Sequence, residues 1–257
     1  CAASIEESHG KKRASTRWHR AASRVLLLQS RPCAVVSGAR AQTDLLTTQS
    51  MGNGEMSAQA FIDELRWRGL LTQVSDEEGL LDYLDAGCQS LYCGFDPTAE
   101  SLHVGSLVPL LALRRFQLQG HRPLLLLGGA TGMIGDPSGR DDERSLNTGD
   151  VVGAWVQALQ AQVSGFLEFE VENDNAAKIV NSLDWTHDLP VIDFLRDIGK
   201  HFSVNSMIQR DSVKTRLERS NEGISYTEFS YMLLQAMDFL RLAQSENCLL
   251  QIGGSDQ

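Results

Sequence analysis

The chain has 257 residues, of which 42% are hydrophobic and 22% charged, and its formal net charge is −10. This length is enough for one large domain or two small ones, and the composition is that of a folded protein rather than a disordered one. The longest apolar runs have about four residues, which excludes a membrane-spanning helix of roughly 18 residues. The acidic balance argues against charge-driven binding of nucleic acid over a broad surface.

The first 50 residues differ in charge from the rest of the chain. They carry eight basic and three acidic side chains, a net charge of +5, which leaves −15 for the other 207 residues. A composition rich in Arg and Ser and poor in acids is typical of an organellar transit peptide. The alternative is a translated stretch upstream of a start at Met51 or Met56. We therefore set residues 1–55 aside as a leader, transit peptide or disordered segment, and expect the start at Cys1 to be incomplete.

Two cellular locations follow from these alternatives. A transit peptide would place the protein in a mitochondrion or plastid, and an upstream artefact would place it in the cytoplasm. The five cysteines form no CxxC pair and no cluster with histidine, so we expect neither a disulfide framework nor a metal site.

The first part of the folded region predicts three helices around one buried strand. Capping residues mark the helix starts and glycines mark the helix ends. The predicted elements are a helix after Ser57 that ends at Gly69, a helix after the capping box Ser75–Glu78 that ends at Gly87, a strand over Ser90–Gly94, and a helix over Val104–Gln119 that ends at Gly120.

The second part continues this alternation of strands and helices. Its elements are a strand over Pro123–Leu127, a helix over Asp150–Phe166 with Val151, Trp155, Leu159 and Val163 in register, a strand over Lys178–Asn181, a helix over Pro190–Ile198 that ends at Gly199, a helix over Glu228–Arg241 after the capping box Ser225–Glu228, and a strand over Cys248–Ile252. Alternation of this kind indicates an α/β fold with a parallel sheet.

Ligands of such sheets bind in the loops at the carboxyl ends of the strands, here after Gly94, Leu127 and Ile252. The sequence has no GxGxxG after the first strand, no Walker GxxxxGK[ST], no GxSxG and no HExxH. Dehydrogenase, P-loop, serine hydrolase and zincin functions therefore lose their main support.

The loop after the first strand contains features of a phosphate site. Gly94 would let the backbone approach a ligand closely. His103 stands at a helix start, where free N–H groups favour phosphate, and Gly105 would leave room for a flat base. Thr98 can donate to the same phosphate. The alternative for His103 is an ordinary helix cap.

Polar side chains also follow the second and last strands. Asp136, in the glycine-rich stretch 128–139, is a candidate partner for a ligand ammonium, or else an ordinary turn residue. Asp256, after Gly253 and Gly254, suits a ribose hydroxyl.

A third polar feature lies within the long helix near the end of the chain. Tyr231, Gln235 and Asp238 are spaced i, i+4 and i+7 and therefore share one face. They form either a ligand-binding stripe or a solvated face. Tyr and Gln are unusual choices for a face that Lys and Glu could occupy.

Together these segments resemble bacterial-type tyrosyl-tRNA synthetases, a family of class I aminoacyl-tRNA synthetases. The resemblance runs from about Phe61 to Gln257. It is carried by YCGFDPTAESLHVGS, GGATGMIGDPSGR, FLRDIGKHFSVN, SYTEFSYMLLQAMDFL and QIGGSDQ, and His103–Ser106 stands where this class has its HIGH signature. It implies a Rossmann-like parallel sheet with helices on both faces, and a catalytic domain over residues 56–257 that is incomplete at its C-terminus.

The resemblance also implies the reaction: tyrosine is activated with ATP, which enters with Mg²⁺ as a substrate, and is then transferred to tRNA(Tyr). It further implies a role for each site residue. Tyr92 and Asp238 would hold the phenol hydroxyl, and Asp136, Tyr231 and Gln235 the ammonium, with Asn181 and Gln257 lining the pocket. Cys93, Gly94, Asp96, Gly105, Gly254 and Asp256 would contact ATP or the adenylate, and Thr98, His103 and Ser106 would act on the phosphates as the catalytic set.

The sequence departs from the family pattern in two ways. Ser106 stands where the signature has its second histidine, which implies weaker contact with ATP. The chain also stops at Gln257, before the family's lysine-bearing signature and its C-terminal tRNA-binding regions. We therefore expect this chain alone to bind tyrosine weakly and not to charge tRNA.

Two other functions remain as alternatives. One is another HxGH-type nucleotidylyltransferase, and the other is a synthetase-derived RNA-binding or splicing protein. The family is homodimeric, which implies an interface near Phe194–Asn205 and at the start of the long helix. Neither the family nor the sequence implies a membrane.

Overall fold

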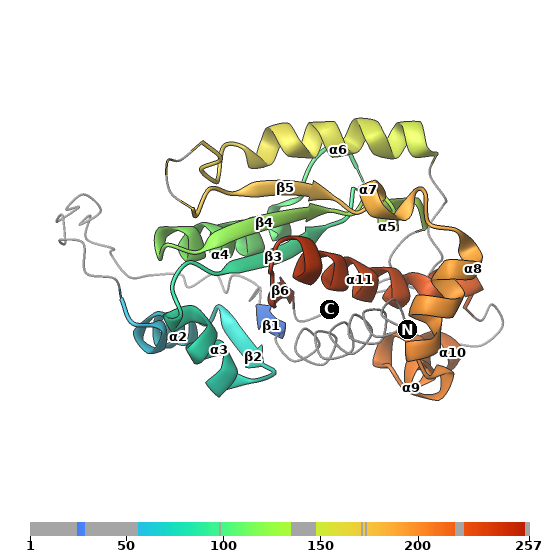
Figure 1. Ribbon diagram of the computed structural model, residues 1–257, viewed down its shortest axis with the longest axis horizontal. Helices are drawn as coiled ribbons and strands as arrows, with labels where there is room; N and C mark the ends of the chain where they lie inside the picture. Colours follow the sequence, from blue (N-terminus) through green and yellow to red (C-terminus); the bar gives the residue numbers. More distant parts are fainter. Residues whose placement is uncertain are drawn as a thin grey trace, which may run out of the picture.

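A computed structural model describes residues 25–28, 56–97, 99–134, 148–170, 172, 174–218 and 224–254. These residues form a six-stranded sheet in the order β2-β1-β6-β3-β4-β5 (Figure 1). All neighbouring strands run parallel except β1 and β2, which are antiparallel. The predicted α/β fold is confirmed. The strands are β1 (Val25–Leu28), β2 (Leu71–Val74), β3 (Ser90–Phe95), β4 (Arg122–Leu127), β5 (Lys178–Asn181) and β6 (Leu250–Gly254).

The helices begin and end largely where their caps predict. Ser57 and Ser225 accept hydrogen bonds from the N–H groups of Ala60 and Glu228, and Gly69, Gly87 and Gly120 have φ values of 68°, 98° and 86°. None of the described helices is long and apolar enough to cross a lipid bilayer. The helices are α2 (Ala58–Trp67), α3 (Glu77–Asp85), α4 (Leu107–Leu118), α5 (Thr131–Ile134), α6 (Gly149–Val163), α7 (Leu183–Thr186), α8 (Val191–Asp193), α9 (Val204–Ile208), α10 (Asp211–Glu218) and α11 (Tyr226–Ser245).

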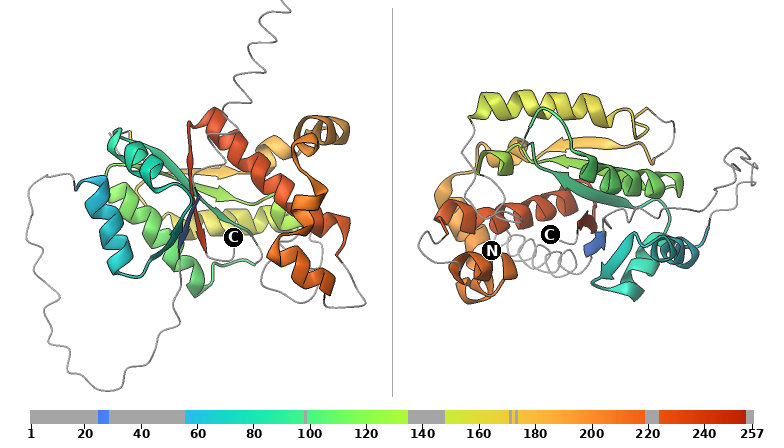
Figure 2. Two further views of the ribbon diagram at one scale, coloured as in Figure 1. Left: turned by 90° about the horizontal axis from the view of Figure 1, so that it is seen from below. Right: turned by 180° about the vertical axis from the view of Figure 1, so that it is seen from behind.

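The central strands divide their side chains between the two faces of the sheet. Leu91, Cys93 and Phe95 of β3 pack with residues of α2, α3, α4 and α6. Tyr92, between them, points to the opposite face and packs with Phe239 of α11. The views in Figure 2 show α2 and α4 on one side of the sheet and α11 on the other. This alternation directs Tyr92 toward α11, which carries the predicted polar stripe.

Two strands were not expected from the sequence. Val25–Leu28 lie in the segment that the sequence analysis set aside, yet they form β1 between β2 and β6. The expectation that residues 1–55 lie outside the fold is therefore wrong for these four residues, whose apolar run is typical of a buried strand. β2 escapes prediction because Thr72 and Gln73 interrupt its apolar ends and are exposed.

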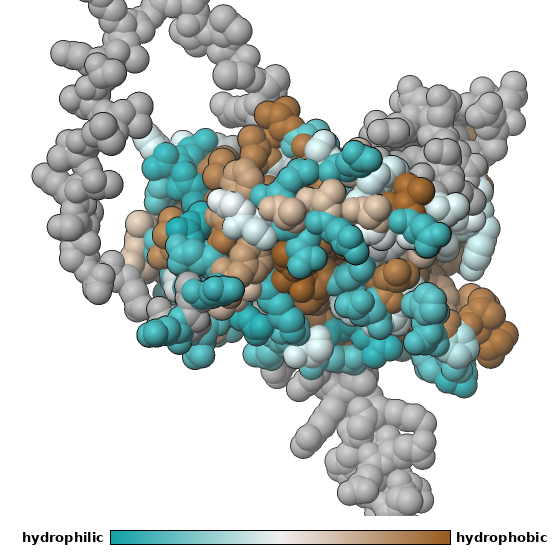
Figure 3. Space-filling model, turned by 90° about the horizontal axis from the view of Figure 1, so that it is seen from above, coloured by the Kyte–Doolittle hydropathy of each residue, from teal (hydrophilic) through white to brown (hydrophobic). Residues whose placement is uncertain are grey.

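Helix α6 is found where it was expected, but it buries a different face. Val152, Val156, Leu159 and Val163 are buried, whereas Val151 is 41% exposed. The predicted series, spaced every four residues, drifts around a helix with 3.6 residues per turn, and only its last two members reach the core. On the side of the molecule that α6 occupies, hydrophobic residues are interspersed with hydrophilic ones (Figure 3).

The helix predicted over Pro190–Ile198 is irregular. Pro190 is its N-cap, α8 covers only Val191–Asp193, and a π-helical turn follows over Phe194–Ile198. The chain then continues through a 3₁₀ turn at Gly199–His201 (η3), so Gly199 does not end the helical segment as expected. The backbone at Gly199 has ordinary helical angles, with φ of −55°, and lacks the positive φ of the glycines that end α2, α3 and α4.

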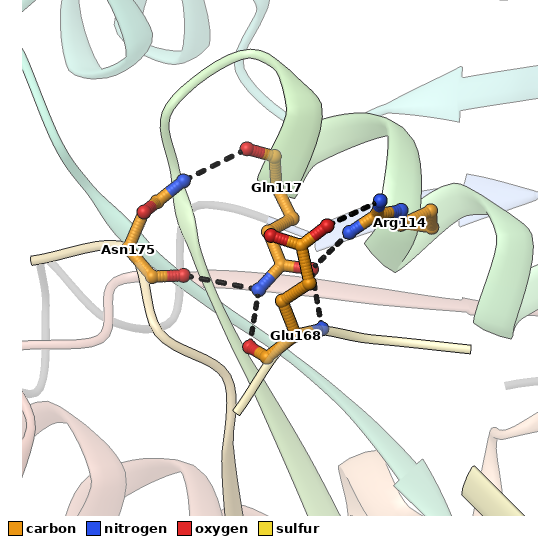
Figure 4. Close-up of polar contacts among 4 residues, drawn as sticks. All are labelled: Arg114, Gln117, Glu168 and Asn175. Atoms are coloured by element: carbon orange, nitrogen blue, oxygen red, sulfur yellow. Dashed lines mark hydrogen bonds and ion pairs between the residues drawn. The ribbon is translucent and has the colours of Figure 1, made fainter. Parts of the chain in front are cut away.

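A buried glutamine joins α4 to the segment that leads into β5 (Figure 4). Gln117 is only 3% exposed. Its amide donates to the carbonyls of Glu168 and Asn175 at 2.7 and 3.2 Å, and its oxygen accepts from the Glu168 N–H and from Arg114 at 3.0 Å each. One side chain thus pairs with the Glu168 N–H and the Asn175 carbonyl and shares the Glu168 carbonyl with the Ala177 N–H.

We expect Gln117→Met to lower the free energy of unfolding by about 1–2 kcal/mol, because methionine fills a similar volume but removes the side-chain partner of the Glu168 N–H and of the Asn175 carbonyl. Urea denaturation of the two proteins measures the change. Gln157→Met, at an exposed position of α6, is the matched control and should change stability by less than about 0.5 kcal/mol. Equal effects of the two substitutions would contradict this role of Gln117.

Candidate active site

A cavity of about 320 Å³ opens at the carboxyl end of β3, beside β6 and α11. This is the edge at which parallel α/β sheets bind their ligands. The cavity brings together segments that are more than 130 residues apart in the sequence. The predicted site residues that line it are Tyr92, Cys93, Gly94, Asp96, His103, Gly105, Ser106, Tyr231, Gln235, Asp238 and Gly254.

The remaining predicted residues do not contribute to this lining. The Asn181 side chain accepts a hydrogen bond from the Leu183 N–H at 3.0 Å and packs against Gly129, so it is directed into the start of α7 rather than into the cavity. Four predicted residues lie outside the described part of the chain, and their roles stay predictions; they are Thr98, Asp136, Asp256 and Gln257.

Tyr92 lines the cavity, and its buried hydroxyl has no hydrogen-bond partner within the described part of the chain. The residue is 1% exposed, and its ring lies 5.4 Å from that of Phe239. Burial raises the pKa of Tyr92 well above its ordinary value, with further contributions from Cys248, Asp238 and Cys93. An unpartnered buried hydroxyl costs about 1–3 kcal/mol, so its presence at a cavity wall points to a polar ligand atom.

Asp238 of α11 places a carboxyl group on the same cavity. It is 3% exposed, and Trp185 Nε1 donates to its Oδ1 at 2.8 Å. Burial raises the pKa of Asp238 to about 7; the hydrogen bond from Trp185 opposes this rise, and the charge of Asp96 adds to it. Trp185 therefore fixes one carboxylate oxygen, and the other oxygen accepts no hydrogen bond from the residues that the structure describes.

The Asp96 carboxylate, just after the end of β3, accepts hydrogen bonds from two hydroxyl groups. Tyr231 donates to its Oδ2 at 2.8 Å and Thr131 to its Oδ1 at 2.6 Å. A side chain at Gly128 would collide with the Asp96 carboxylate and the Thr131 hydroxyl, so glycine is required there. These contacts join β3, the start of α5 and α11 into one polar wall.

The polar stripe of α11 is part of this wall and not a solvated face. Tyr231 and Asp238 are 7% and 3% exposed, and both line the cavity together with Gln235. The ligand-binding interpretation of their spacing is therefore favoured over the alternative. Gly94 also lies at the cavity, and a Cβ atom there would meet nothing within 4 Å, so the backbone at this position is open to a ligand.

His103 is both a helix cap and part of the cavity wall. It is the N-cap of the short turn η1 (Val104–Ser106), and its Nδ1 accepts from the Gly105 N–H at 3.0 Å. The alternative of an ordinary cap is thus correct for one ring nitrogen. The His103 ring also occupies the position that a side chain at Gly105 would take, because a Cβ there would lie 2.8 Å from its Cε1. Gly105 itself lines the cavity, and its expected contact with a flat base stays a prediction.

Sequence reasoning missed two residues of the site. Thr131 and Trp185 each orient a carboxylate, as described above. Thr131 lies within the glycine-rich stretch 128–139, where a hydroxyl among glycines was the available signal. Trp185 follows the carboxyl end of a predicted strand, and this position was the only signal in the sequence for its place in the site.

Comparison with known proteins gives a consistent result. The family described as tRNA synthetases class I (W and Y) matches residues 87–257. Curated relatives named tyrosine–tRNA ligase include those of Aliivibrio salmonicida, 60% identical over 196 residues, and Yersinia enterocolitica, 58% identical over 202 residues. A solved structure of a C-terminally truncated mitochondrial tyrosyl-tRNA synthetase from Aspergillus nidulans superposes with a TM-score of 0.67 at 33% identity, covering 77% of this chain and 57% of that one.

These matches cover most of this chain but only part of each relative. The Aliivibrio and Yersinia alignments take in 76% and 79% of this chain, and 46% and 47% of the relatives. The chain therefore spans about half the length of the curated relatives it matches.

Proposed function

Because the chain belongs to the class I tRNA synthetases of the tryptophan and tyrosine group, we propose that its cavity binds L-tyrosine and ATP and joins them as tyrosyl-adenylate. The tyrosyl group then passes to the 3′-terminal ribose of tRNA(Tyr). The curated relatives cited above carry the name tyrosine–tRNA ligase, which supports tyrosine as the amino acid.

The unpartnered Tyr92 hydroxyl is the observation that carries this choice of amino acid. A bound tyrosine would accept a hydrogen bond from Tyr92 and donate its own phenolic hydrogen to the Asp238 oxygen that Trp185 does not contact. Both buried groups would then be satisfied by one ligand atom. A phenylalanine side chain has no atom that can do so.

The opposite end of tyrosine meets the polar wall. Tyr231 and Gln235, together with Asp136, would bind its ammonium group, and Gln257 would complete the pocket around them, whereas Asn181 is directed into the start of α7. On the nucleotide side, Cys93, Gly94, Asp96, Gly105, Gly254 and Asp256 would contact the adenylate. Thr98, His103 and Ser106 would meet the phosphates, the serine with less reach than a histidine.

The proposed reaction depends on alignment of the tyrosine carboxylate with the α-phosphate and needs no acid–base catalyst. The tyrosine carboxylate is already ionised at neutral pH and attacks the α-phosphorus of ATP, which enters with Mg²⁺ as a substrate. An oxygen–phosphorus bond forms, the α–β anhydride bond breaks, and pyrophosphate leaves. The protein holds the two reactants in line and directs N–H and O–H donors at the phosphate oxygens as charge develops there.

A homodimer is also part of the proposal. The segment from α8 to the start of α11 exposes several large apolar side chains, which is typical of a surface that another chain covers. Sedimentation of the full-length protein as a monomer at micromolar concentration would contradict this part. The exposed residues are Val191, Ile192, Leu195, Val204, Ile208 and Tyr226.

Exchange of labelled pyrophosphate into ATP tests the proposed function on the protein encoded by the complete reading frame. We expect exchange that requires tyrosine and is far weaker with phenylalanine. Exchange without any amino acid would favour another nucleotidylyltransferase. No exchange, together with RNA binding, would favour a synthetase-derived RNA-binding protein.

A further inference from the structure

The hydrogen bond between Gly105 and the His103 ring determines which nitrogen of that ring carries the proton. Nδ1 of His103 accepts from the Gly105 N–H at 3.0 Å, so Nδ1 must present a lone pair. In the neutral ring the proton then resides on Nε2, which becomes a donor. The ring lines the cavity, and this donor is the nitrogen that is not engaged with the backbone.

The same contact depends on the absence of a side chain at Gly105. A Cβ atom there would lie 2.8 Å from Cε1 and 2.9 Å from Nδ1 of His103, closer than carbon atoms approach without displacement. Gly105 does not have a positive φ, so alanine fits its backbone and only the histidine ring stands in the way. His103 is exposed, so the ring would swing away and lose the hydrogen bond.

We propose that Gly105 is a positioning residue that acts through His103. Its amide selects the Nε2–H form of the ring, and its missing side chain lets the ring lie where Nε2–H can donate to an ATP phosphate oxygen. This inference rests on the proposed function, because it takes a phosphate as the group that meets His103. It differs from the expectation that Gly105 makes room for the base.

A double-mutant cycle on the full-length protein separates these two roles. We expect Gly105→Ala and His103→Ala each to lower kcat of pyrophosphate exchange by about 10²-fold, the size of losing one phosphate-directed donor. The double variant should be no slower than His103→Ala, because Gly105 has nothing left to position. Multiplication of the two losses, or a raised KM for ATP with unchanged kcat in Gly105→Ala, would overturn the proposal.

A second measurement does not depend on activity. In ¹⁵N-labelled protein without ATP, we expect an Nε2–H ring at His103 and a scalar coupling across the hydrogen bond from the Gly105 nitrogen to Nδ1, and we expect Gly105→Ala to abolish this coupling. Gly153→Ala on α6, where a Cβ meets nothing within 4 Å, is the matched control and should leave the coupling unchanged. An Nδ1–H ring in the parent protein would overturn the inference even if tyrosine-dependent exchange is present, and absent exchange alone would refute only the proposed function.

Discussion

Replacing Asp238 with alanine is expected to reduce the preference for tyrosine over phenylalanine by roughly 10- to 100-fold. The reason is that the tyrosine hydroxyl loses a charged hydrogen-bond acceptor, worth about 1.5–3 kcal/mol, whereas phenylalanine loses nothing by the change. The ratio of kcat/KM for the two amino acids in pyrophosphate exchange measures this preference directly. The effect should appear mainly as weaker use of tyrosine rather than as better use of phenylalanine.

Two further variants show whether the loss of preference for tyrosine arises at the groups expected to bind its hydroxyl, Tyr92 and Asp238. Tyr92→Phe keeps the ring beside Phe239 and removes only the unpartnered hydroxyl, so it should lower the preference in the same direction. Tyr83→Phe is the matched control: that hydroxyl is buried too, but it donates to the Ser90 carbonyl at 2.8 Å, away from the cavity. Discrimination that is unchanged in Asp238→Ala would refute the assigned role.

The buried carboxyl group of Asp238 should also make the protein less stable as the pH rises. Its pKa is about 7 in the folded protein against 3.8 for the ordinary group, because burial disfavours the charged form. The folded state therefore holds this proton more tightly than the unfolded state does. Stability contributed by the neutral form is present below pH 4 and is lost as the pH rises to about 7. A shift of this size corresponds to about 4 kcal/mol.

Asp238→Asn removes this dependence and keeps an oxygen that can accept from Trp185. We expect the variant to be more stable than the parent at pH 8, by up to about 4 kcal/mol, with a difference that shrinks toward pH 5. Urea denaturation of both proteins across this range measures it, since other titrating groups cancel in the difference. Asp150→Asn, at an exposed position, is the control and should show no such trend. A difference that stays constant with pH would contradict the account.

These two results together would mark Asp238 as a residue kept for binding at the expense of stability. An isolated buried carboxylate is unfavourable in the empty protein. A tyrosine hydroxyl that donates to it offsets part of that cost in the complex. Active sites commonly hold such groups, and their replacement commonly stabilises a protein while impairing its function.

The sequence was most informative where one local rule governs the structure. Helix ends at Gly69, Gly87 and Gly120 were predicted because each adopts a positive φ, which only glycine adopts readily. The polar stripe of Tyr231, Gln235 and Asp238 was predicted because helical spacing puts these residues on one face. Both inferences use only neighbours in the sequence.

It was least informative where contacts between distant segments decide the structure. The pairing of β1 with β6 joins residues more than 200 positions apart, and a four-residue apolar run does not by itself reveal such a partner. Trp185 orients Asp238 across 53 positions of sequence, so its role depends on how α7 and α11 pack. The buried face of α6 likewise follows from what the sheet presents to it, and of the predicted apolar series only Leu159 and Val163 are buried.

A crystal structure with L-tyrosine bound tests the central claim most directly. We predict that the phenolic oxygen lies within hydrogen-bond distance of both the Tyr92 hydroxyl and the Asp238 carboxylate, with the ammonium group toward Tyr231 and Gln235. Tyrosine bound in the reverse orientation, or outside this cavity, would contradict the account.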